Sequence, residues 1–312
     1  MSRVLITGAG GMVGAHMVPE LLNSGWEVAA MGRQDAPTAR LTSHQHRLQW
    51  FRADLCDREQ VAGVVAAWRP SHVLHLASTP FNPPVSSDTH VDVNVAGIDN
   101  LLDALKATPD VRVVYTGSAA QYGEGDRLKE ATPEKPTTLL GASKAAAGIL
   151  LHTYGRLFGM QTIELRLFTP YGPMERPQRL LPHTILSALR KQPVRLGNGR
   201  QERDYLYIDD VVAAVHAALV APVASGSVFN VCSGIPTSVR ALVTETLHLM
   251  GNPVTAEFDA LPTRSDEIWK LSGDSTQAQK ALNWSPRVSM VEGLNRSIEW
   301  YKQNRTLAEG LT

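Results

Sequence analysis

Three glycines near the start of the chain have the spacing that a bound diphosphate requires. Gly8, Gly11 and Gly14 lie in "TGAGGMVG", after the apolar stretch "RVLIT" and before the helix-like stretch "AHMVPELLNSG". Glycine lets the backbone turn tightly, lets a pyrophosphate approach the helix N-terminus, and lets the helix pack closely on the strand. The motif predicts a dinucleotide site that includes Met12; a plain strand-to-helix turn is the alternative.

The end of the second apolar stretch bears on which dinucleotide binds. It reads "VAAMGRQ", with Gly32 where an acidic side chain would accept hydrogen bonds from a ribose 2'-hydroxyl, and with Arg33 next to it. A guanidinium suits a 2'-phosphate, so we expect NADP. Two observations keep NAD as the alternative: Asp35 lies close by, and Arg33 could be a solvated loop cation.

"ADL" at 53–55 ends the third apolar stretch. There, Asp54 and Leu55 are expected beside the adenine of the cofactor. The competing interpretation makes Asp54 the N-cap of the helix "CDREQVAGVVAAW", because aspartate caps helices well.

These residues must be positioned by an α/β fold. Short apolar stretches alternate with helix-length segments, which predicts a Rossmann-type doubly wound parallel sheet with helices on both faces. The predicted strands lie at 3–7, 26–31, 48–53, 72–77, 111–118, 161–168 and 227–233. We expect a dinucleotide-binding domain of 1–168 plus about 205–233. A smaller substrate-binding lobe of about 169–204 plus 234–312 would cover the carboxyl edge of the sheet.

Composition narrows the partners. The 312 residues carry 30 basic and 30 acidic side chains with no block of like charge, so neither nucleic acid nor an acidic membrane is expected. Cys56 and Cys232 cannot build a disulfide framework or a metal site. No apolar run reaches the roughly 18 residues of a membrane span, and the N-terminus leaves no room for a signal peptide. We expect a cytoplasmic protein that binds small molecules and no metal.

Across essentially its whole length, the chain resembles the extended short-chain dehydrogenase/reductase family. That family contains nucleotide-sugar epimerases, dehydratases and ketoreductases. The motifs that carry the resemblance are "TGAGGMVG", "HLAS", "VNVAG" with Asn94, "GSAAQYG", "GASK", "RLFTPYGP", "RDYLYIDDV", "FNVCSG" and "TRSDE". Within the family, "VFNVCSGIPTSVRALV" is similar to the GDP-4-keto-6-deoxymannose reductases.

The resemblance implies a reacting group of Ser/Thr, Tyr and Lys. Ser118 and Lys144 match the first and last, but Leu140 stands four residues before the lysine, where the tyrosine belongs. In the family, the phenol exchanges a proton with a sugar oxygen and the serine orients the carbonyl. The lysine lowers the pKa of the phenol and also holds the nicotinamide ribose. Leucine cannot exchange a proton.

Another group must therefore carry the proton if the chain is active. Tyr154 is excluded because it lies about 15 Å further along the same helix. The remaining substitutes are Tyr122 beside the Ser118 loop, Tyr171, His75, or a water held by Ser118 and Lys144. A change introduced at position 140 is a further explanation.

On the substrate side, the resemblance implies that Arg203 and Arg264 clamp a diphosphate. Planar guanidinium forks pair well with phosphate oxygens. Ser78 and Thr169 are expected to contact the substrate, although Thr169 replaces the family's usual asparagine and loses the reach of its amide. A dehydratase of this family needs an Asp-Glu pair after the serine. Ala119 and Ala120 stand there, which argues against dehydration.

Three hypotheses follow. The first is an NADP-dependent ketoreductase or epimerase of a nucleotide-linked deoxysugar. The second is a binding protein that has lost its redox chemistry, and the third is a reductase of a small non-nucleotide carbonyl compound, which the two arginines oppose. The resemblance also implies a homodimer formed by the helices near 91–106 and 141–158.

Overall fold

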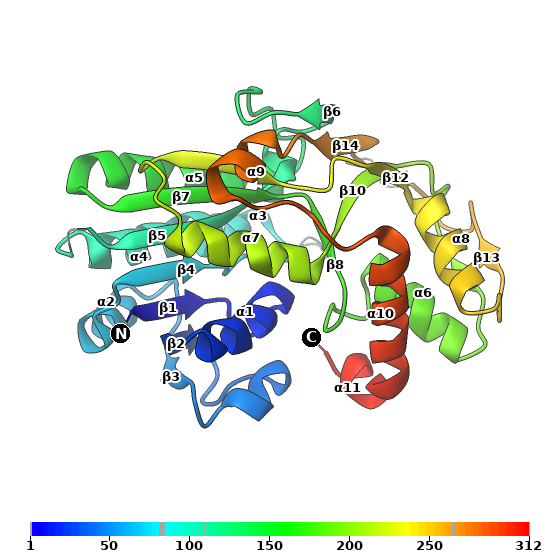
Figure 1. Cartoon of the computed structure of the whole chain (residues 1–312), viewed down its shortest axis with the longest axis horizontal. Coiled ribbons are helices and arrows are strands. Elements are labelled where there is room, and N and C mark those ends of the chain that lie inside the picture. The colour runs from blue at the N-terminus through cyan, green and yellow to red at the C-terminus, as the bar shows by residue number, and fades with distance from the viewer. Residues whose placement is uncertain (1, 81–84, 109, 264–265, 312) are drawn as a thin grey trace.

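The computed structural model describes residues 2–80, 85–108, 110–263 and 266–311 (Figure 1). Its main element is a seven-stranded sheet with the order β11-β7-β5-β4-β1-β2-β3. All its strand pairs are parallel. The strands are β1 (Arg3–Thr7), β2 (Glu27–Gly32), β3 (Gln49–Arg52), β4 (His72–His75), β5 (Arg112–Ser118), β7 (Gln161–Leu167) and β11 (Ser227–Val231). Each matches one of the seven predicted stretches, so the predicted fold is confirmed.

Helices cover both faces of this sheet because successive side chains of a strand point to opposite faces. Val4 and Ile6 pack in a core with α1 (Met12–Asn23) and α7 (Ile208–Val220). Leu5, between them, packs on the other face with α2 (Arg58–Trp68), α4 (Gly97–Leu105) and α5 (Leu139–Phe158). Strands buried on both faces read as unbroken apolar runs, which is why they could be predicted.

Helix α5 carries Leu140 and Lys144, so its limits matter for the site. The hydroxyl of Thr138 caps its N-terminus by accepting a hydrogen bond from the Gly141 N–H. The helix ends at Phe158, and Gly159, which caps it, has a positive φ of 73° that glycine adopts without strain. Positions 140 and 144 are therefore one turn apart, as predicted.

The second half of the chain adds a smaller sheet with the order β12-β10-β14-β6. It consists of β6 (Gly125–Leu128), β10 (Glu202–Tyr207), β12 (Pro236–Ser238) and β14 (Lys270–Gly273), while β8 (Thr169–Tyr171) pairs with β10. The strands β9 (Val194–Arg195) and β13 (Ala256–Glu257) pair with each other. The nearby helices are α6 (Leu180–Leu189), α8 (Val239–Leu249), α9 (Thr276–Leu282), α10 (Met290–Gln303) and α11 (Arg305–Glu309).

The predicted domain limits stay a prediction, but two placements bear on them. Strand β6 comes from the first half of the chain and pairs with β14 of the smaller sheet. Helix α7 follows β10 directly, yet it packs on α1 beside the large sheet. The two halves are thus interleaved. Over the described residues, no helix has both the length and the apolar character needed to cross a membrane.

Candidate functional site

A cavity of about 880 Å³ lies at the carboxyl edge of the large sheet. Its walls come from the loop after β1, the end of β2, and the segments that follow β3 and β4. Residues far along the chain close it on another side: Arg176, Gln178, Gly310 and Leu311. Open α/β sheets bind ligands at this edge.

The glycine loop is shaped for a diphosphate. Gly8 has a φ of +72°, and a Cβ there would lie 2.5 Å from the Ala77 backbone nitrogen. A Cβ on Gly14 would lie 2.5 Å from the Cα of Ala9. Gly11 is the N-cap of α1, which Met12 opens, and no side chain of the described residues caps this end, so its first N–H groups are available to an anion. These residues fit the pyrophosphate of a dinucleotide.

Asp54 and Leu55 both line the cavity, but Asp54 is not the cap of α2. Asp57 is the N-cap, because its carboxylate accepts hydrogen bonds from the Glu59 and Gln60 N–H groups. The alternative that made Asp54 the cap is therefore wrong. Asp54 instead accepts a 3.0 Å hydrogen bond from the N–H of Cys56. Its contact with an adenine stays a prediction.

Gly32 and Arg33 also line the cavity, at the end of β2. Arg33 is exposed and makes no hydrogen bond or ion pair with any residue that the structure describes. Asp35, one of the two reasons to keep NAD as the alternative cofactor, forms an ion pair with Arg52 at 2.7 Å. At the end of β2, the charged side chain that has no hydrogen bond or ion pair with a described residue is thus the cation Arg33.

Several lining residues were missed from the sequence. Trp50 and Thr38 face the cavity from β3 and the loop after β2. Arg40 is buried and donates hydrogen bonds to the carbonyls of Gly10 (3.0 Å) and Met174 (2.9 Å). It therefore ties the glycine loop to the segment after β8. No local pattern marks these residues, because the fold alone brings them together.

Ser118 and Lys144 lie at the end of β5 and on α5, which pack against each other. The Lys144 ammonium is buried, donates to the Thr116 carbonyl at 2.7 Å, and lies 4.8 Å from the centre of the Tyr115 ring. Burial lowers the pKa of Lys144 to about 7, an effect that nearby Glu164 opposes. The Ser118 hydroxyl accepts a hydrogen bond from the Ala120 N–H at 3.2 Å.

A buried network connects the predicted substrate edge with the lysine helix. The Asn94 amide donates to the hydroxyls of Thr79 (2.9 Å) and Ser143 (2.8 Å), and Ser143 precedes Lys144. Ser78, beside Thr79, donates to the Thr79 carbonyl and lines the cavity. Asn94 lies in the π-helical segment 91–96, a conformation often found at functional sites.

The side chains predicted as substitute proton carriers are buried. The Tyr122 hydroxyl donates to Asn230 at 2.7 Å, and desolvation is the main cause that raises its pKa to about 12. Burial also raises the pKa of Tyr171. His75 hydrogen-bonds with Thr7 at 2.7 Å, and burial lowers its pKa to about 3. These arrangements give Tyr122 no support as a proton donor, and the group that carries the proton stays a prediction.

The structure describes the predicted substrate residues except Arg264. Thr169 begins β8 and pairs with Tyr205 of β10. Arg203, on β10, forms an ion pair with Glu267 and donates to the Ile268 carbonyl. Arg264 lies outside the described residues, so the predicted pair of arginines is not seen together. Ser118, Lys144, Thr169 and Arg203 are not among the described residues that line the cavity.

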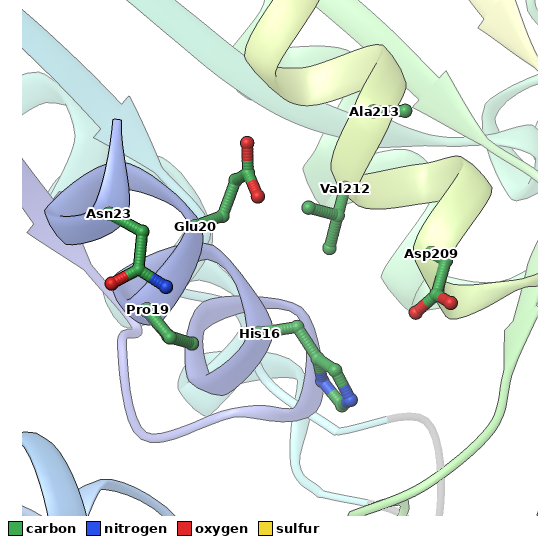
Figure 2. A pocket seen from close by; sticks show the side chains of 7 residues that line it. All are labelled: His16, Pro19, Glu20, Asn23, Asp209, Val212 and Ala213. Carbon is green, nitrogen blue, oxygen red and sulfur yellow. The ribbon is translucent and has the colours of Figure 1, made fainter.

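A second hollow of about 330 Å³ lies between α1 and α7. Figure 2 shows His16, Pro19, Glu20 and Asn23 facing Asp209, Val212 and Ala213 across it. Its carboxylates are engaged: Glu20 binds His216 at 2.8 Å, and Asp209 binds Arg296 at 3.0 Å. We assign no function to it. The described residues also contain no group of three or more His, Cys, Asp and Glu side chains that could hold a metal.

Comparison with known proteins agrees with this geometry. The chain is 31% identical to MoeE5 in a solved complex with UDP-glucuronic acid and NAD, which matches with a TM-score of 0.88 over 97% of this chain and 100% of that one. UDP-glucuronic acid 4-epimerase from Bacillus cereus, solved with UDP-glucuronic acid and NAD, is 27% identical, with a TM-score of 0.88 over 96% and 99%.

UDP-glucose 4-epimerase of Mycolicibacterium smegmatis is 28% identical, over 96% of this chain and 98% of that protein. The model of a family described as NAD dependent epimerase/dehydratase matches residues 4–232. Since that match spans well over half of the sequence, this chain belongs to the NAD dependent epimerase/dehydratase family.

Proposed function

We propose that the chain is an NADP-dependent ketoreductase or epimerase of a nucleotide-diphospho-sugar, with a proton route that does not use a tyrosine on α5. The observation that carries this proposal is the cavity, where the glycine loop fits a diphosphate and Arg33 has no partner among the described residues. When bound, the nicotinamide gives or takes a hydride. The residues of the chain bind it and move the proton.

The cofactor preference rests on charge at the end of β2. A 2'-phosphate is dianionic or nearly so, and Arg33 can meet it with two parallel hydrogen bonds. Residue 32 has no side chain to accept from a 2'-hydroxyl, and Asp35 is already held by Arg52. NAD, which is bound in the MoeE5 and Bacillus cereus structures, remains the alternative.

The substrate class rests on Arg203 and on the relatives. The solved MoeE5 and Bacillus cereus proteins bind UDP-glucuronic acid. Arg203 is partly buried and is fixed by the Ile268 carbonyl, so its guanidinium is oriented before a ligand arrives. A diphosphate would compete with Glu267 for this guanidinium. Arg264, three residues before Glu267 in the sequence, would supply the second cation of the clamp.

Proton transfer is assigned to Ser118, Lys144 and a water between them. The Ser118 oxygen accepts from the Ala120 N–H and keeps its own hydrogen for a ligand. Lys144, with a pKa of about 7, can give or take a proton near neutrality. The acid pair of a dehydratase is replaced by Ala119 and Ala120, which are both buried, so we do not propose dehydration.

Two other functions remain as alternatives. One is a protein that binds both nucleotides without chemistry, and the other is a reductase of a small carbonyl compound. Mass spectrometry of the nucleotides that co-purify with the chain separates them. We expect NADP together with a nucleotide sugar. A dinucleotide with no nucleotide sugar, followed by turnover of a small ketone only, would contradict the proposed substrate.

Replacing Arg33 by alanine should weaken NADP binding by about 1 to 3 kcal/mol, the range for a lost hydrogen bond to a charged group. NAD binding should change little, because NAD has no 2'-phosphate. Calorimetric titration of both cofactors measures the two effects. Arg195→Ala, an exposed arginine of β9 outside the cavity, is the matched control. Equal losses for both cofactors would contradict the NADP assignment.

The chain should form a homodimer through α4 and α5. Ile149 and Leu157 of α5 lie about two turns apart, and they are 67% and 70% exposed, so this helix presents apolar surface that a second copy would cover. Light scattering at micromolar concentration should give twice the mass of one chain. The double change Ile149→Glu and Leu157→Glu should give a monomer, whereas Ile235→Glu, at an equally exposed site elsewhere, should not. A monomeric wild type would contradict this interface.

A further inference from the structure

Gly32 faces an aromatic ring and not open space. Strands β2 and β3 are parallel, with Ala30 opposite Trp50 and Gly32 opposite Arg52. Because residues 30 and 32 point to the same face, the indole of Trp50 extends diagonally from its own partner towards Gly32. A Cβ on Gly32 would lie 2.7 Å from Cζ2 and 2.9 Å from Cη2 of that indole.

The indole is held in this place from two sides. Its Nε1 donates a hydrogen bond of 3.0 Å to the Gln34 carbonyl, in the loop that follows Gly32. Its ring packs against the apolar core that β1 forms with α1 and α7. Trp50 also lines the cavity beside Arg33. The ring therefore fills the volume that a side chain at position 32 would need, and it forms part of the cofactor wall itself.

We propose that Trp50 closes position 32 to any side chain and thereby determines cofactor specificity. This inference rests on the proposed cofactor site. An acid at position 32 would bind the ribose hydroxyls of NAD, but the indole leaves no room for it, and Arg52 holds the nearby Asp35. Recognition at this end is left to Arg33, which selects for a 2'-phosphate. The determinant is a residue on the neighbouring strand, 18 positions after Gly32.

Cofactor binding tests this in four proteins: wild type, Gly32→Asp, Trp50→Ala and the double variant. Gly32→Asp alone should weaken both NADP and NAD. The double variant should bind NAD at least about tenfold more tightly than Gly32→Asp alone, since a hydrogen bond to a carboxylate then becomes possible. Tighter NAD binding by Gly32→Asp alone would show that the indole moves aside, and would overturn the inference.

A readout without cofactor separates this inference from the proposed function. Gly32→Ala should lower the melting temperature of the ligand-free protein, and the same change should cost little in the Trp50→Ala background. An equal loss in both backgrounds would overturn the steric claim. The wild type could bind NAD more tightly than NADP while Gly32→Ala still costs stability only when Trp50 is present. That result would overturn the proposed NADP dependence and leave the steric claim supported.

Discussion

Replacing Leu140 by tyrosine is expected to raise the rate of hydride transfer by about 10² to 10⁴, the usual contribution of a general acid or base. Leu140 lies in the first turn of α5, one turn before Lys144, and is only partly buried. A phenol there would point to the same side as the lysine. The measurement is single-turnover oxidation of NADPH by a keto-deoxysugar nucleotide.

Leu140→Phe is the matched control, because it adds the ring without the hydroxyl. The larger ring could strain the site by about 1 to 3 kcal/mol, and the phenylalanine variant reports that strain alone. NADP affinity should be the same in all three proteins. A fall in rate with tyrosine, from a wild type that already turns over quickly, would show that the wild-type proton route is already efficient without a phenol. It would also contradict the idea of a missing donor.

Lys144→Met is expected to change how stability depends on pH. Burial lowers the pKa of Lys144 from its usual 10.5 to about 7 in the folded chain. Between these values the unfolded chain binds a proton that the folded chain does not, so raising the pH favours folding. Below pH 7 both states are protonated and this contribution is constant. The free energy of unfolding of the wild type, minus that of the variant, should therefore grow between pH 7 and 9 by up to about 3 kcal/mol.

Denaturant titration of the ligand-free proteins at several pH values measures this difference. Lys302→Met, at an exposed lysine of α10, is the control, because its ammonium stays in water in both states. The free energy of unfolding of the wild type, minus that of Lys302→Met, should not change with pH. A flat difference for Lys144 as well would mean that its amine is not desolvated, and would remove it from the proposed proton route.

The large sheet could be predicted from sequence because its strands are buried on both faces. Stretches such as Val113 and Val114 of β5 are fully buried and apolar, so they stand out without any periodicity. The strands of the smaller sheet carry no such signal. Strands β12 and β14, at 236–238 and 270–273, are too short for alternation to be recognised.

The site could be predicted only where its residues follow one another in the sequence. The glycine loop and Lys144 stand in local motifs, whereas Trp50, Arg40 and Leu311 reach the cavity through the fold. Asp57 is a different case, because the sequence does contain a pattern that marks it as the N-cap of α2. It precedes Gln60 by three residues, the spacing of a capping box, although the Gln60 side chain here donates to the Asp57 carboxylate (2.7 Å) and accepts from the Asp54 N–H, not from that of Asp57.

The central claim, that this chain still performs redox chemistry on a nucleotide sugar without the tyrosine, is tested most directly by one measurement on the wild type. NADPH is bound to the protein, a keto-deoxysugar nucleotide is added in single-turnover amounts, and the absorbance of the reduced nicotinamide is followed. We expect the absorbance to fall as the sugar is reduced, at a rate that drops when Ser118 is replaced by alanine. Unchanged absorbance, with both ligands shown by calorimetry to be tightly bound, would contradict the account and identify the chain as a binding protein.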